Sequence, residues 1–514
     1  MMPTFFRSAI AGAIAAAVAL AVGELFGGLV SGAPSLIVAV GALVIDLQPP
    51  GAKQFVVEIF GEADKLALEL AVVLVALLLG AALGVLAARR AWIGSAGFAA
   101  AGIVGIVAAL GNPLVSPMLA VLGSLLAVAA GIFALRWLLA AARPPSPAPH
   151  GATVTTPMPD AARRRFLILA GGTASAAAVA GIFGRSMFGR AAAAPAAPTS
   201  LPVAAEALPS PPPAAILDVP GITPLVVPNE DFYRIDTSLV VPRLDRDAWR
   251  LRITGMVDRE VELTYDQLLE LPLMERYVTI ACVSNEVGGG LMGNAKWAGV
   301  RLDEVLDMAG VQPGATQIVG RAFDGWTAGF PTAYGGPDGR EGLIAIGMND
   351  EVLPHAHGYP ARLIIPGLYG YVSATKWLTE IELTTLEAFD GYWVPLGWAK
   401  EAPVLTQSRI DVPRSGGGLM AGRVPIAGIA WAPDRGIERV EVSIDNGPWQ
   451  PAVLSAPLSD DTWVQWKLEW DATPGQHLLQ VRATDRTGET QTDRRTRPAP
   501  DGARGWHMVA VTVS

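Results

Sequence analysis

Long apolar runs dominate the first 190 residues of this 514-residue chain, and short alternating patterns dominate the rest. An apolar run of about 20 residues crosses a hydrocarbon core of about 30 Å as a helix, because each helical residue adds about 1.5 Å. The pattern therefore predicts about five transmembrane helices within residues 1–190. The five runs are 8–30, 66–88, 91–110, 118–142 and 166–183.

A sixth apolar stretch, residues 35–47, is too short to cross the membrane and is bracketed by prolines at positions 34, 49 and 50. We expect it to be interfacial or re-entrant.

Arginines lie at alternate ends of the five runs. They are Arg7 before the first, Arg89 and Arg90 between the second and third, Arg143 after the fourth, and 163–165 before the fifth. Because cytoplasmic loops are enriched in Lys and Arg, this places the N-terminus in the cytoplasm and everything after residue 184 outside. Arg185 and Arg190 run against the bias. We expect a multi-pass protein of the cell membrane.

Three consecutive arginines, 163–165, precede Phe166, Leu167 and a Gly/Ala-rich run. This order is similar to an internal twin-arginine export signal, a route that carries folded proteins. The alternative is that the arginines simply anchor a helix on the cytoplasmic side. The sequence leaves open whether the chain is cut after this run or keeps it as an anchor.

The composition changes after residue 190. Residues 191–220 are rich in Ala and Pro and predict a semi-extended linker. Residues 221–400 predict an α+β domain with a helix at 302–309, and residues 401–514 predict a β-sandwich. The expected strands include 249–253, 277–281, 362–365, 377–383, 439–444 and 477–483, and the turn at 445–447 reads Asp-Asn-Gly.

Charge and cysteine content exclude several functions. The net charge of −9 argues against a nucleic-acid binder, which needs a basic face. A single cysteine, Cys282, excludes an intrachain disulfide framework, a cysteine-ligated iron–sulfur cluster and a Cys-rich zinc site. Five histidines leave little material for a His-built metal site.

Cys282 ends an expected strand and is followed, after a short polar segment, by the three glycines 288–290. A free cysteine is most often a small buried hydrophobe. A nucleophilic cysteine would need a nearby base, and no histidine lies within 60 residues of it in sequence. The remaining reading is a thiolate ligand for a soft metal.

Four segments then follow in order. They are Cys-Val-Ser-Asn at 282–285, Lys-Trp-Ala-Gly-Val-Arg-Leu at 296–302, His-Gly-Tyr-Pro-Ala-Arg-Leu-Ile-Ile-Pro-Gly at 357–367, and Ser-Ala-Thr-Lys-Trp-Leu at 373–378. Their order and spacing resemble the sulfite oxidase family of molybdopterin enzymes, which includes sulfite oxidases, assimilatory nitrate reductases and a periplasmic methionine-sulfoxide reductase subunit. The similarity extends from about residue 224 to residue 514.

The resemblance implies that residues 221–400 bind molybdopterin and that Cys282 supplies the thiolate to molybdenum. A thiolate on a high-valent metal is deprotonated outright. Arg and Lys suit the phosphate of the pterin tail, one as a fork and one as a point charge. The cofactor contacts implied in this way are Tyr233, Arg234, Cys282, Asp324, His357, Arg362, Ala374, Thr375 and Lys376.

These residues also have plainer interpretations. Arg362 and Lys376 could be surface charges, and His357 could be a loop histidine bonded to backbone. Segments 428–431, 435–443 and 505–507 are similar to the family's immunoglobulin-like dimerisation domain. The resemblance therefore implies an immunoglobulin-like fold for residues 401–514 and a possible homodimer.

The expected substrate pocket departs from that of sulfite oxidases. Glu286 and Val287 stand where sulfite oxidases carry arginines after the Cys-x-x-Asn, and Trp326 stands in place of their pocket tyrosine. A carboxylate in a partly desolvated pocket repels sulfite and nitrate. With Asn285 and Glu286 in the pocket, we expect a sulfoxide, an N-oxide or another small oxo compound, although Glu286 could be a solvated loop charge.

No haem, flavin or iron–sulfur cluster is expected in this chain. The apolar runs contain no histidine, which excludes bis-His b-haem there. We therefore expect a separate electron-transfer partner or a quinone, together with membrane lipid. The alternatives are a sulfite-oxidising enzyme with an atypical pocket and a non-catalytic membrane scaffold that keeps the fold.

Overall fold

The computed structural model describes residues 4–48, 60, 64–111, 115–142, 159–187, 200–335, 341–416 and 418–514. The chain divides into two compact units. Unit 1 comprises Met1–Ala193 and Thr237–Arg243, and unit 2 comprises Ala194–Asp236 and Leu244–Ser514. Each is described by itself.

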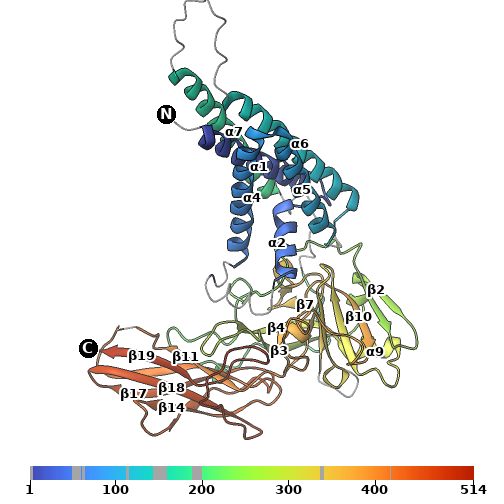
Figure 1. Ribbon diagram of the computed structural model, residues 1–514. Helices are drawn as coiled ribbons and strands as arrows, with labels where there is room; N and C mark the ends of the chain where they lie inside the picture. The colour runs from blue at the N-terminus through green and yellow to red at the C-terminus, as the bar shows by residue number, and fades with distance from the viewer. Residues whose placement is uncertain are drawn as a thin grey trace, which may run out of the picture. The chain divides into compact units, whose positions relative to one another are not determined.

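Unit 1 is helical (Figure 1). Its helices are α1 (Thr4–Leu29), α2 (Leu36–Asp46), α4 (Asp64–Arg89), α5 (Ala91–Leu110), α6 (Pro117–Ala142) and α7 (Pro159–Met187). Five of them, all but α2, are long and apolar enough to cross a membrane, which confirms the five predicted runs as helices. The short run at 35–47 forms the 11-residue α2, whose N-cap Ser35 accepts a hydrogen bond from the backbone N–H of Val38.

Helix α1 packs against α4, α6 and α7, and small residues permit this. A Cβ added at Gly12 of α1 would overlap the backbone of Gly80 and Gly84 in α4. A Cβ added at Gly28 of α1 would likewise overlap the backbone of Gly184 in α7. Such close backbone approach is how apolar helices associate where lipid removes the hydrophobic drive.

A polar cluster joins four of these helices. Glu24 of α1 is 2% exposed, and its Oε1 accepts a 2.6 Å hydrogen bond from the hydroxyl of Ser35. Arg185 of α7 donates to Glu69 of α4 at 2.5 Å and lies 4.0 Å from Oε2 of Glu24. The arginine that departs from the positive-inside bias is therefore held by carboxylates.

Unit 2 begins with the described part of the expected linker, residues 200–220; residues 191–199 lie outside the described residues. This part is mostly irregular, with a short 3-10 helix, η2 (Pro213–Ala215), and it is hydrogen-bonded to the domain. Glu206 bridges Met274, and the N–H of Leu208 donates to Glu275 at 2.7 Å. The N–H of Leu217 donates to Gln465 at 2.7 Å. Proline-rich composition predicts a semi-extended linker but not these contacts.

The first part of unit 2 contains two sheets. One has the order β2-β1-β10-β5-β6, and the other has the order β3-β4-β7-β8 with β9 paired to β7. The strands are β1 (Arg250–Gly255), β2 (Val261–Thr264), β3 (Leu273–Ala281), β4 (Met292–Arg301), β5 (Gln317–Ala322), β6 (Thr327–Pro331), β7 (Leu343–Met348), β8 (Glu351–Val352), β9 (Arg362–Ile364) and β10 (Leu378–Thr384). The helices are α8 (Tyr265–Leu269), α9 (Leu302–Ala309) and α10 (Gly370–Ser373), so the helix predicted at 302–309 is confirmed.

The last hundred residues form two further sheets around one apolar core, which includes Ile426, Val442, Trp466, Leu479 and Val511. The strands are β11 (Gln407–Val412), β12 (Gly418–Leu419), β13 (Gly422–Trp431), β14 (Ile437–Ile444), β15 (Gln450–Pro451), β16 (Val453–Leu454), β17 (Val464–Ala472), β18 (Gly475–Asp485) and β19 (His507–Val513). Their orders are β11-β13-β17-β16 and β12-β19-β18-β14-β15. This confirms the predicted two-sheet sandwich.

The turn predicted after β14 is also confirmed. Asp445 and Asn446 have φ values of 55° and 56°, which two-residue hairpin turns of this kind require.

The close contact between α1 and α4 gives a testable expectation. Gly12→Ala should lower the thermal unfolding midpoint of the detergent-solubilised protein, because the added methyl overlaps backbone and costs about 1–3 kcal/mol. Gly171→Ala in α7 is the matched control, since no atom lies within 4 Å of the added Cβ. The control should leave the midpoint unchanged or slightly higher. Equal midpoints for the two variants would contradict the packing.

Candidate cofactor-binding site

Cys282 begins the loop that joins two antiparallel strands. Ala281 of β3 pairs with Met292 of β4, and the N–H of Cys282 donates to the carbonyl of Leu291 at 2.9 Å. The thiol is 7% exposed, and its Sγ lies 3.1 Å from the hydroxyl oxygen of Ser284. We call residues 282–291 the thiol loop.

The thiol loop is ordered by its own hydrogen bonds. The N–H of Asn285 donates to the carbonyl of Cys282 at 3.1 Å, and Oδ1 of Asn285 accepts from the N–H of Leu291 at 2.8 Å. Glu286 is exposed, whereas Asn285 is partly buried. The structure therefore corrects one premise of the sequence argument, because Glu286 does not lie in a desolvated environment in this chain.

Arg362 starts β9 and is 3% exposed. Its Nη1 donates to the carbonyl of His357 at 3.0 Å, its Nη2 donates to the carbonyl of Ala374 at 3.4 Å, and its guanidinium lies 5.0 Å from the ring centre of Trp297. Within the described residues, its Nε has no hydrogen-bond partner and no carboxylate pairs with it. Burial lowers the pKa of Arg362 to about 10. A buried cation without a paired carboxylate is energetically unfavourable, and a bound anion would stabilise it.

Lys376 lies in the fourth of the four segments, residues 373–378, and is paired with Asp236. Its Nζ donates to Asp236 at 3.0 Å and to the carbonyl of Ala356 at 3.3 Å. Arg234 donates to the same oxygen of Asp236 at 3.1 Å. Burial lowers the pKa of Lys376 to about 8, against the opposing effect of Asp236. The neighbouring Thr375 is 0% exposed, and its hydroxyl has no partner among the described residues.

His357 is buried and neutral. Its Nε2 lies 2.8 Å from the carbonyl oxygen of Asn229, and its ring meets the ring of Phe232 edge-on at 5.6 Å. Burial, together with the charge of Arg362 and against the opposing hydrogen bond to Asn229, lowers the pKa of His357 to about 4. The neutral ring donates one hydrogen bond and carries no charge at neutral pH.

Two tyrosines, Tyr233 and Tyr369, lie within electrostatic reach of the thiol. Burial raises the pKa of Tyr233, and negative charge at Cys282 raises it further. Burial also raises the pKa of Tyr369 to about 12, again with a contribution from Cys282. Both phenols therefore stay protonated at neutral pH and can donate hydrogen bonds.

Asp324 and Trp326 lie on the turn between β5 and β6. Asp324 accepts a 3.2 Å hydrogen bond from the N–H of Trp326. Burial raises the pKa of Asp324, and the charge of Asp236 also raises it while that of Lys376 lowers it. The structure thus brings Asp324, Asp236 and Lys376 within electrostatic reach of one another. It gives no contact between Trp326 and the thiol.

Hydrogen bonds therefore join several of the predicted residues into two groups, one around Arg362 and one around Asp236. Direct contacts link Arg362 to His357 and Ala374, and Asp236 links Lys376 to Arg234. Tyr233 responds to the charges of both Cys282 and Arg362. The sequence reasoning missed three contributors: Asn229, Asp236 and Ser284. Asn229 and Asp236 closely flank Tyr233 and Arg234, which was the available signal.

These residues fit a phosphate-bearing, thiolate-liganded cofactor. The buried guanidinium with an unpaired Nε and the buried unpaired hydroxyl of Thr375 supply donors for an anion. The thiol at the start of an ordered loop supplies a soft ligand. Arg362 is neither a surface charge nor paired within the described chain, so the plainer interpretation of this residue is wrong.

Comparison with known proteins points to a molybdopterin-binding domain. Residues 238–393 match the family model described as the oxidoreductase molybdopterin binding domain. Human mitochondrial sulfite oxidase is 32% identical over 345 residues, which cover 56% of this chain and 62% of that protein. An NADH nitrate reductase of Oryza sativa subsp. japonica is 26% identical over 319 residues, covering 49% of this chain and 34% of that protein.

The crystal structure of the sulfane dehydrogenase SoxCD from Paracoccus pantotrophus shares the fold, with a TM-score of 0.51 and 24% identity over 57% of this chain and 82% of that chain. Residues 238–393 are thus a molybdopterin-binding domain. These matches support a molybdopterin oxidoreductase of the sulfite oxidase family. It spans 62% of the length of the human sulfite oxidase that it matches.

Arg362→Gln should lower the molybdopterin content of the purified protein at least tenfold, because a charge-assisted hydrogen bond contributes about 1.5–3 kcal/mol. The glutamine amide can still donate to a carbonyl, so folding should persist, as circular dichroism would show. Arg252→Gln is the control, since Arg252 makes an exposed pair with Glu380. Full pterin content in Arg362→Gln would remove Arg362 from the site.

Proposed function

We propose that this chain is a membrane-anchored molybdenum oxidoreductase that catalyses two-electron oxo transfer outside the cytoplasm. The observation that carries the proposal is the buried, carboxylate-free guanidinium of Arg362 in the same domain as the buried thiol of Cys282. A non-catalytic scaffold would have no reason to retain an uncompensated buried cation, which costs several kcal/mol unless an anion binds to it.

Different residues would bind the metal and the phosphate-bearing tail of the cofactor. Cys282 would bind molybdenum as a thiolate. Arg362, Lys376 and Thr375 would hold the phosphate-bearing tail, with Arg362 in the role of a donor fork and Lys376 positioned by Asp236. When bound, the molybdenum centre supplies the two-electron oxo-transfer chemistry.

Other residues would shape the pterin surroundings without charge. His357 donates from a neutral ring and is fixed by Asn229, so it does not compete with Arg362 for the anion. The protonated phenol of Tyr233 can donate a hydrogen bond near the thiolate. Asp324, Arg234 and Ala374 complete the proposed cradle.

Metal analysis and one substitution test this function. The full-length protein from a molybdopterin-competent host should contain about one molybdenum per chain. Cys282→Ser should lose oxo-transfer activity with an artificial electron donor by more than about 100-fold, since even outer partners of a metal site cost 10–100-fold. Thr492→Ala, which removes an exposed hydroxyl bonded to Asp493, is the control and should retain full activity. Less than a tenth of an equivalent of molybdenum, or an active Cys282→Ser, would refute the proposal.

The proposed substrate is a sulfoxide, an N-oxide or another small oxo compound. Asn285 and Glu286 follow the thiol on its loop, and Trp326 completes the proposed pocket. Because Glu286 is exposed, its repulsion of an anion is worth about 1 kcal/mol rather than several. Sulfite oxidation is therefore a second candidate, favoured by the 32% identity to a sulfite oxidase.

Glu286→Arg separates these two substrates. The substitution should raise kcat/KM for sulfite about fivefold and leave kcat/KM for a neutral sulfoxide nearly unchanged, because only the anion responds to the charge. The control is Glu341→Arg. It makes the same change of charge outside the thiol loop, at a residue that is paired with Arg276 of β3. A wild-type kcat/KM for sulfite that exceeds that for every sulfoxide and N-oxide would establish the second candidate.

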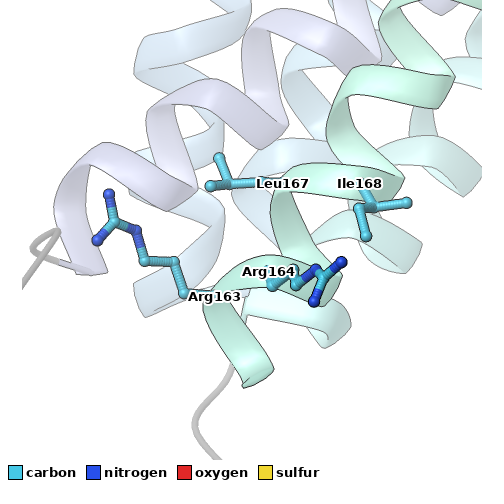
Figure 2. Close-up of a pocket in the computed structure, with 4 residues that line it drawn as sticks. All are labelled: Arg163, Arg164, Leu167 and Ile168. Carbon is cyan, nitrogen blue, oxygen red and sulfur yellow. The ribbon is translucent and has the colours of Figure 1, made fainter. Parts of the chain in front are cut away.

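The membrane bundle is proposed as a permanent anchor with its N-terminus in the cytoplasm. Arg163 and Arg164 lie in the second turn of α7, where they are exposed and line a shallow hollow of about 440 Å³ with Leu167 and Ile168 (Figure 2). Phe166, between them, is fully buried against Ala11 and Leu138. Exposed arginines there can meet lipid headgroups or an export machinery, so the twin-arginine reading remains a proposal.

Contacts at the C-terminal end of α7 support the proposal that this helix is retained. Arg185 is bonded to Glu69, and Gly184 touches the backbone of α1. We expect the mature protein to keep α7, so the intact mass of the membrane-extracted chain should include residues 163–187. Arg185→Gln should loosen the bundle and lower its unfolding midpoint, with Arg136→Gln, which meets only Ser95 among the described residues, as control. A mature N-terminus beyond residue 187 would contradict this.

The proposal also includes partners. Electrons would pass to or from a separate protein or a quinone. The C-terminal sandwich would have the immunoglobulin-like fold of the family's dimerisation domain and would pair with a second copy. No haem, flavin or iron–sulfur cluster is assigned to this chain in the proposal.

A further inference from the structure

The C-terminal sandwich contacts the thiol loop directly. Gly288 has φ +82°, and a Cβ added there would overlap the imidazole ring of His507, the first residue of β19. Nδ1 of His507 accepts a 3.0 Å hydrogen bond from the N–H of Ile410 in β11. The ring is therefore fixed from behind and presents its other edge to the loop.

Arg409 of β11 makes the second contact. Its Nη1 donates to the carbonyl of Gly289 at 2.7 Å, and its Nε donates to Asp411 at 2.7 Å. Its Nη2 donates to the hydroxyl of Thr223 at 2.6 Å. All three guanidinium nitrogens have partners, so the position of the carbonyl of Gly289 is strongly constrained.

The strand that leads to the thiol is held by the same half of unit 2. The N–H of Thr279 donates to the carbonyl of Asp461 at 2.9 Å, and its hydroxyl accepts from the N–H of Trp463 at 2.8 Å. Thr279 precedes Cys282 by three residues. Both the approach to the thiol and the loop after it are therefore fixed by residues beyond position 400.

We propose that Arg409 and His507 are positioning residues that set the conformation of the thiol loop, and through it the substrate side of the molybdenum site. Among the described residues, their hydrogen bonds go to neither the thiol nor the proposed phosphate donors. Their effect falls on Asn285 and Glu286, which lie between Cys282 and the two clamped glycines. The C-terminal sandwich then helps to position the thiol loop, in addition to any role in dimerisation. This inference rests on the proposed function.

The inference separates cofactor binding from substrate binding. The hydrogen bonds that hold Arg362 and Lys376 come from residues outside β11 and β19, so loss of the clamp leaves these donors in place. A displaced Gly289 carbonyl moves the segment that carries Asn285. Substrate affinity and the environment of the metal should change while the metal stays bound.

The test uses the full-length, molybdenum-loaded protein and its variants Arg409→Lys, Gly288→Ala and His507→Asn. Lysine keeps the charge but cannot serve Gly289, Asp411 and Thr223 together. We expect Arg409→Lys to keep full molybdenum content, to raise KM at least fivefold with a smaller change in kcat, and to shift the electron paramagnetic resonance signal of Mo(V). His477→Gln, on β18 and bonded to Asp445, is the control and should change none of these.

A double substitution tests the direct contact. Asparagine at 507 can still accept from Ile410 but removes the ring edge that faces Gly288. Gly288→Ala alone should lower kcat/KM about tenfold, and adding His507→Asn should restore at least a third of the loss by making room for the methyl. A product of the single effects with no such recovery would refute the contact.

The outcomes are distinguishable from failure of the proposed function. Wild-type protein without molybdenum would overturn the function itself. Molybdenum-loaded Arg409→Lys with unchanged KM and an unchanged Mo(V) signal would overturn only the positioning role. If Gly288→Ala does not fold, Arg409→Lys alone decides, because it keeps the charge and the pair with Asp411.

Discussion

A buried guanidinium without a carboxylate is the constraint on which the site depends. Arg362 is held between two backbone carbonyls and the face of Trp297, and these contacts orient it without neutralising it. Burial opposes its charge, and Lys376 nearby is similarly opposed even though Asp236 pairs with it. The anion of the proposed cofactor would remove this free-energy cost, so cofactor affinity and folding would be coupled in this domain.

The thiol is held by a different part of the chain from the one that holds the cations. Cys282 starts a hairpin loop, and the loop is fixed from within by Asn285 and from outside by Arg409 and His507. In the proposed site, the metal ligand is therefore held separately from the phosphate donors.

Much of the architecture could be predicted from sequence because it follows from short-range rules. Apolar length determines the five long helices, alternation determines the strands, and Asp-Asn-Gly determines the turn after β14. The burial of Arg362 could not be predicted from composition, since arginine is rarely buried. Exposure of Glu286 was equally inaccessible, because it depends on how the loop meets β19. Asn229 and Asp236 act through contacts more than 100 residues away in sequence, and periodicity carries no signal of such contacts.

Arg185 shows how a tertiary contact changes the meaning of a topology signal. The positive-inside bias counts basic residues because a free cation resists transfer across the membrane. Arg185 is paired with Glu69 and lies 4.0 Å from Glu24, so its charge is offset by carboxylates within the bundle. Its charge therefore does not count against the proposed orientation. Arg185 and these two carboxylates link α7 to α1 and α4. A helix with such contacts to two neighbours is a structural part of the bundle, whereas a leader that is removed needs no such contacts.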